Sequence, residues 1–113
     1  MKLRALLCVL ASLAASCSYV EATSKAYDGV PQFMPLNPNS VRILSGEPKE
    51  RHDRLGEVLV HVSVDPPGKP EEIGLRLREE AAKLGANGVY IARDSTTPRE
   101  GHRIVGIAIR FRQ

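Results

Sequence analysis

The chain is 113 residues long and 42% apolar, which suits one small domain with a single hydrophobic core. Its formal net charge is +3, from 16 basic and 13 acidic residues, and two of the basic residues, Lys2 and Arg4, lie in a short leader. Without that leader, 14 basic residues stand against 13 acidic ones, which excludes the clustered positive charge of a nucleic-acid-binding surface.

Residues 1–16 have the pattern of a secretory signal peptide. Two positive charges precede the apolar run of ten residues at 5–14, and small residues follow it. A run of this length is too short to cross a bilayer, which takes about 20 residues. A buried N-terminal helix is the alternative, but the apolar pattern stops after Ser18. We therefore predict that this leader is removed and that the protein leaves the cytoplasm.

Cys17 follows the leader directly, and the only other cysteine, Cys8, lies inside the apolar run. Cys17 thus has no partner in the processed chain. The segment LAASC resembles the bacterial lipobox, although Ala14 stands where leucine is preferred. The resemblance implies cleavage before Cys17, a thioether-linked diacylglycerol on its sulfur, and acylation of the new amino terminus. In enteric-type bacteria, Ser18 after the lipidated cysteine would favour the outer membrane, with the domain facing the periplasm.

Ordinary signal-peptide cleavage after Ala22 is the alternative, because the sequence VEA places small residues at the usual positions. The mature chain would then begin at Thr23 and would be soluble in the periplasm.

Residues 17–38 are expected to be the lipidated cysteine and a flexible tether. They show no stable hydrophobic period and contain Gly29, Pro31, Pro35 and Pro38. A flexible chain of about 20 residues spans roughly 25 Å. The alternative is that Phe33, Met34 and Leu36 pack on the domain as a strap.

Residues 39–113 are expected to form the domain, beginning with a short β-branched strand near residues 40–45 and a charged loop at 48–54. Residues 55–64 alternate between apolar and polar, which predicts a strand covered on one face only. Two more strands are predicted near 87–93 and 102–112, joined by a polar loop at 94–101. The side chains predicted to face inward are Val58, Val60, Val62, Val64, Val89, Ile91, Val105, Ile107, Ile109 and Phe111.

Between these strands, residues 70–85 predict one helix. Ile73, Leu77, Ala81 and Leu84 form an apolar stripe at helical spacing, and Gly85 suits the left-handed stop. The glutamates at 71, 72, 79 and 80 are expected on the solvated face. The order strand, strand, helix, strand, strand predicts an α+β fold. We expect a small two-layer sandwich with one helix on a mostly antiparallel sheet.

The segments Leu55–Val58 (LGEV), Leu77–Asn87 and Val89–Ile91 resemble a group of small bacterial proteins. This group includes the RcsF-like outer-membrane lipoproteins and the YbjQ-like family. The resemblance covers roughly residues 41–111 and implies their α+β fold. RcsF-like sensors carry disulfides in this domain, whereas this chain has no cysteine after Cys17. YbjQ-like proteins are often described as heavy-metal binders and lack a lipobox leader.

No residue pattern indicates catalysis or a cofactor. The histidines at 52, 61 and 102 lack the spacing of a metal site, and there is no CxxC motif. His61 and His102 could meet across the sheet, but solvated positions are the expectation, so no metal is predicted. We expect a protein that is not an enzyme.

The sequence therefore predicts an envelope lipoprotein that binds or senses a protein partner near the outer membrane. A periplasmic small-ligand or metal-binding module is the alternative. Small residues between arginines on the last strand, at Gly106 and Ala108, suggest a shallow basic groove on the outer sheet face. The predicted partner-binding residues are therefore Arg103 and Arg110, together with the 94–103 loop.

Overall fold

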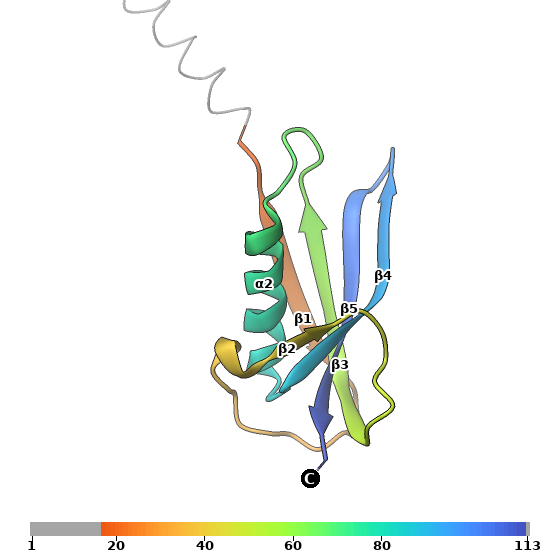
Figure 1. Ribbon diagram of the computed structural model, residues 1–113. Coiled ribbons are helices and arrows are strands. Elements are labelled where there is room, and N and C mark those ends of the chain that lie inside the picture. The colour runs from red at the N-terminus through yellow and green to blue at the C-terminus, as the bar shows by residue number, and fades with distance from the viewer. Residues whose placement is uncertain (1–16, 113) are drawn as a thin grey trace, which may run out of the picture.

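The structure is a computed structural model that describes residues 17–112, so the predicted signal peptide at 1–16 lies outside the described residues. One α-helix packs on one face of a five-stranded sheet (Figure 1). The elements are β1 (Val20–Ala26), the 3₁₀ turn η1 (Pro38–Ser40), β2 (Arg42–Leu44), β3 (His52–Val62), α2 (Pro70–Lys83), β4 (Gly88–Thr97) and β5 (Gly101–Phe111).

The strands lie in the order β1-β3-β5-β4-β2, and all neighbours are antiparallel except β2 and β4. The predicted α+β class, with one helix on a mostly antiparallel sheet, is confirmed. No helix within residues 17–112 combines the length and the apolar character needed to span a bilayer.

The main core lies between α2 and the sheet. Val58, Val60 and Val62 of β3 are buried there, as their alternation predicted, and they join Leu77 and Ala81 of the helix. Val64, predicted to face inward with them, instead lies beyond the end of β3 and is 53% exposed. The helix ends as expected, because Gly85 has a φ of 78° that favours glycine. Glu80, predicted to be solvated, is instead only 4% exposed and forms an ion pair with Lys83.

The prediction of a flexible tether over residues 17–38 is wrong for residues 20–26. These residues form β1, which pairs with β3 from Val20 opposite Val62 to Ala26 opposite Gly56. Inward and exposed side chains alternate along β1, but the apolar signal is weak because the inward residues after Val20 are the small Ala22 and Ser24. Pairing with the strongly patterned β3 therefore sets its conformation, and local propensity does not.

Residues 27–37 also pack on the domain and partly follow the strap alternative. The Leu36 N–H donates to the Ala82 carbonyl at 3.0 Å, and Phe33 packs against the core. Met34 does not join them, since its side chain is 84% exposed.

The inward face predicted for β5 is reversed. Ile104, Gly106 and Ala108 lie toward α2, whereas Ile107 and Ile109 lie on the opposite sheet face. There they pack with Tyr90, and the partly buried Leu44 and Phe111 complete a second, smaller core. Both faces of β5 are apolar in the sequence, so polarity does not tell which face meets the helix. The small residues Gly106 and Ala108, which leave room for the helix, identify that face.

Candidate functional site

The predicted basic groove is absent from the described part of the sheet. Gly106 and Ala108 are buried beneath α2, and the alternation of β5 places Arg103 and Arg110 on opposite faces. Arg103 pairs with Glu100 at 3.3 Å. The loop predicted at 94–101 is also mostly strand, because β4 continues to Thr97 and β5 starts at Gly101.

Arg110 has a packing role at the C-terminal end of the helix. Its guanidinium donates to the Gly85 carbonyl at 3.0 Å and lies 5.1 Å from the centre of the Phe33 ring. It therefore joins β5, the helix end and the segment before η1, which leaves little of it free for a partner.

The histidines considered as a metal pair do not meet. His61 lies opposite Arg103 and His102 lies opposite Val62, so alternation directs the two imidazoles to different sheet faces. His102 contacts the Asp94 carboxylate at 2.6 Å, and His61 contacts the Glu100 carbonyl at 3.2 Å. Across residues 17–112, no three His, Cys, Asp or Glu side chains gather in a way that could hold a metal ion.

A cluster that the sequence did not reveal covers the second core. Glu47, in the segment between β2 and β3, accepts hydrogen bonds on one carboxylate oxygen from three side chains. His52 Nε2 lies at 3.1 Å, Arg54 Nε at 2.8 Å and the Tyr90 hydroxyl at 3.3 Å. The cluster fixes the segment between β2 and β3 to the sheet, so its role is to hold a loop.

The electrostatics of this cluster follow from its geometry. The hydrogen bonds from Arg54 and His52 lower the pKa of Glu47. His52 faces the Glu50 carbonyl with Nδ1 at 2.6 Å and the Glu47 carboxylate with Nε2, and both are acceptors. An imidazole satisfies two acceptors only when both nitrogens carry protons, and these contacts, the Glu50 carbonyl first, raise the pKa of His52.

A cavity of about 240 Å³ opens at the end of the domain where the helix stops. It lies between the residue 26–33 segment and the last turn of α2, and its apolar walls include Tyr27, Phe33, Leu55 and Leu84. Lys83 is the charged side chain at its rim. The cavity is large enough for a small, mostly apolar group.

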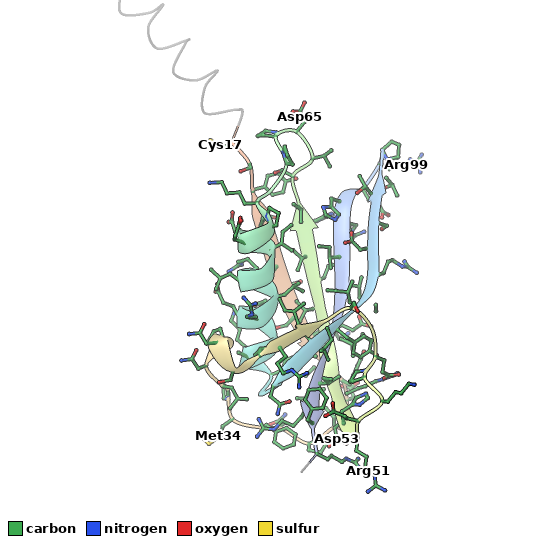
Figure 2. All side chains as sticks on the ribbon, in the orientation of Figure 1. Cys17, Met34, Arg51, Asp53, Asp65 and Arg99 are labelled. Atoms are coloured by element: carbon green, nitrogen blue, oxygen red, sulfur yellow. The ribbon has the colours of Figure 1, made fainter. Side chains whose placement is uncertain are left out.

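Cys17 lies at the opposite end of the domain and is exposed. Figure 2 shows it beside the Asp65 turn, at the same end as Arg99, whereas Met34, Arg51 and Asp53 lie at the other end. The chain is fixed to the sheet only two residues later. The Tyr19 N–H donates to Ser63 Oγ at 2.9 Å, and the Ser63 N–H donates to the Tyr19 carbonyl at 3.0 Å.

The strand β1 forms an edge of the sheet. Its odd-numbered residues bond to β3, because the Ser63 N–H donates to the Tyr19 carbonyl and the Tyr27 N–H donates to the Leu55 carbonyl at the two ends of the pairing. The peptide groups of Ala22, Ser24 and Ala26 therefore point away from the sheet. An edge of this kind can accept a further strand.

No family model matches the chain, and no curated protein matches it. A solved structure described as the Francisella virulence factor FvfA, in its orthorhombic form, is similar to this one with a TM-score of 0.58. The match covers 84% of this chain and 100% of that chain at 15% sequence identity. A likeness at this identity shows a shared fold and no more. The resemblance to RcsF-like and YbjQ-like proteins stays a prediction.

Proposed function

We propose that this chain is a non-enzymatic envelope lipoprotein, anchored through Cys17 in the outer membrane, whose domain binds a protein partner in the periplasm. The observation that carries the proposal is the position of β1 relative to the two candidate cleavage sites. Cleavage before Cys17 keeps all of β1, whereas cleavage after Ala22 removes Val20, Glu21 and Ala22 from a seven-residue strand.

Cleavage after Ala22 would remove contacts that stabilise the fold, and this supports cleavage before Cys17. Val20 is 8% exposed and belongs to the main core, opposite Val62 of β3. A chain that begins at Thr23 would also lose the two hydrogen bonds between Tyr19 and Ser63. The fold therefore favours processing at the residue that the lipobox resemblance marks for a lipid.

The open edge of β1 supports the protein-binding part of the proposal. Its outward peptide groups offer main-chain hydrogen bonds to an extended segment of another chain, a frequent mode of peptide recognition. Glu21, Thr23 and Lys25 alternate with these groups and lie on the exposed side of the strand. Their side chains would determine which extended segment binds.

Mass spectrometry of the mature amino terminus tests the anchor. We expect an acylated Cys17, and Cys17→Ala should release the protein from membranes. Cys8→Ala is the matched control, because it alters a leader cysteine and should leave lipidation intact. An unmodified amino terminus at Thr23 would contradict the proposal.

Photocrosslinking in intact cells tests the partner. A crosslinker at Thr23, whose side chain is exposed beside the β1 edge, should capture a protein, and one at Lys49 in the exposed segment between β2 and β3 should not. Equal capture at both positions would show that the edge is not the binding surface.

A periplasmic small-ligand module is the second candidate, favoured by the cavity beside Phe33 and Leu84. Native mass spectrometry of the purified protein distinguishes the two functions. A small molecule that copurifies and is lost in Leu84→Trp, which fills the cavity, would favour the ligand-binding function.

A further inference from the structure

Four large apolar side chains are exposed among the described residues: Tyr19, Met34, Val64 and Leu75. Two of them, Tyr19 at 52% and Val64 at 53% exposure, lie at the Cys17 end of the domain. Exposed apolar residues that gather at one place on a small domain mark a contact surface more often than scattered ones do.

Hydrogen bonds hold the backbone of Tyr19 beside the residue that precedes Val64. The Ser63 N–H donates to the Tyr19 carbonyl and the Ser63 hydroxyl accepts from the Tyr19 N–H, and Ser63 is the residue before Val64. Ser63 Oγ also donates to the Pro66 carbonyl at 2.7 Å and so holds the turn that follows. On the other side, a Cβ at Gly101 would lie 3.7 Å from a Val64 methyl, which places the β4–β5 turn next to it.

The linkage to Cys17 is short. Only Ser18 separates Cys17 from Tyr19, so the two Cα atoms lie within about 7 Å of each other even if the chain is fully extended. A tether of 20 residues would let the domain tumble above a membrane, but this linkage does not. A lipid on Cys17 would bring Tyr19 and Val64 to the bilayer surface.

We infer that Tyr19 and Val64 form a membrane seat, a surface that inserts into the interface of a zwitterionic phospholipid layer and holds the domain upright. This inference rests on the proposed lipidation of Cys17. Tyrosine suits this depth because its ring is apolar and its hydroxyl can remain in water. Met34 then lies at the end away from the membrane (Figure 2). The cavity lined by the neighbouring Phe33 lies away from the membrane as well.

Charge does not drive this contact. The segments at this end, residues 64–72 and 97–101, carry four acidic side chains against two basic ones: Asp65, Glu71, Glu72 and Glu100 against Lys69 and Arg99. A surface with this balance gains nothing from anionic lipid. The seat therefore depends on its apolar side chains, and its membrane contact should be insensitive to salt.

Fluorescence on the lipidated protein tests the inference. After processing, the sulfur of Cys17 is blocked by its thioether, so Val64→Cys provides the one free thiol for an environment-sensitive dye. Met34→Cys, at the far end, is the matched control. Each labelled protein is placed in phosphatidylcholine vesicles with and without a spin label on the lipid acyl chains.

We expect the dye at position 64 to shift to shorter wavelength and to be quenched by the spin-labelled lipid. The dye at position 34 should keep the emission it has in water. Adding Tyr19→Ser should reduce the quenching at position 64, and raising the salt concentration should not.

A lipidated protein whose dye at position 64 stays in water would overturn the seat and leave the proposed function standing. Quenching that appears only with anionic lipid would overturn it as well, because the contact would then be electrostatic. A chain with unmodified Cys17, read from its mass before labelling, would instead contradict the proposed function.

Discussion

Gly106 of β5 lies directly beneath Leu77 of α2. A Cβ at position 106 would stand 3.3 Å from a Leu77 methyl and 2.9 Å from a methyl of Val89. The absent side chain is therefore what allows the helix to approach the sheet at this point.

We expect Gly106→Val to destabilise the protein by about 1–3 kcal/mol, because the added methyl groups must displace buried neighbours. Gly46→Val is the control, since nothing lies within 4 Å of a Cβ there. Urea unfolding of both variants measures the difference. If both variants unfold at the same midpoint, the helix does not pack on Gly106.

Leu77 itself carries much of the contact between helix and sheet, because its side chain is only 3% exposed. Leu77→Ala should cost about 2–5 kcal/mol, a large share of the total stability of a small domain. Leu75→Ala, on the same helix but 47% exposed, should change the melting temperature little. Similar losses in the two variants would mean that the helix is rotated.

Ser63 joins the start of β1 to the turn after β3. Its hydroxyl accepts from the Tyr19 N–H and donates to the Pro66 carbonyl, and the residue is 6% exposed. Ser63→Ala should cost about 1–2 kcal/mol. Hydrogen exchange at the Tyr19 amide should speed up more than at amides in the middle of β3, while the exposed control Ser45→Ala should leave both unchanged.

Arg110 and Arg103 should differ in their effect on stability. Arg110→Ala removes both the bond to Gly85 and the stacking on Phe33, so we expect a loss of about 1–2 kcal/mol. Arg103→Ala breaks only a surface pair with Glu100 and should cost less than about 1 kcal/mol. Thermal unfolding of the two variants measures the two losses, and equal losses would contradict the packing role of Arg110.

The Glu47 cluster should make stability depend on pH. Because the pKa of Glu47 is lowered, its carboxylate stabilises the fold fully at pH values above the ordinary pKa of 4.5. This stabilisation is lost as the pH falls through the lowered pKa. The raised pKa of His52 means that its contribution is complete below 6.5 and is lost as the pH rises through the raised value. Both contributions are present together between these two ordinary values.

The difference in melting temperature between the parent and Glu47→Gln should therefore be greatest in mildly acidic solution. It should shrink at lower pH, as Glu47 is protonated, and partly shrink at higher pH, as His52 loses its proton. Glu50→Gln is the control, because the Glu50 side chain has no contact in the cluster and only its carbonyl meets His52. A difference that stays constant across this range would show that Glu47 and His52 do not interact.

The sequence predicted the elements whose two sides differ in polarity. On β3 the valines alternate with polar residues, and on α2 the stripe through Leu77 has charged neighbours. The sides predicted to be buried were therefore correct for both elements. On β5 both sides are apolar, and the pattern could not say which one meets the helix. The strand β1 was missed because Ala22 and Ser24 are too small to give an apolar signal.

The candidate sites were harder to predict than the fold. The cluster joins Glu47 of the β2–β3 segment to Tyr90, 43 positions away, and nothing local to Tyr90 marks it as a partner. The arginine groove failed for a related reason, because the direction of Arg110 depends on the face of β5 that α2 covers. The lipidation hypothesis for Cys17 is different, since it depends on the neighbouring residues in the sequence and needs no knowledge of the fold.

The strand order has a consequence for the sequence of events in folding. Ala22 pairs with Val60 and Ile43 with Val89, so β1 and β2 emerge long before their partners, while β4 and β5 are joined by a tight turn. In a chain delivered from its amino end, the two edge strands must wait and the last hairpin can form at once.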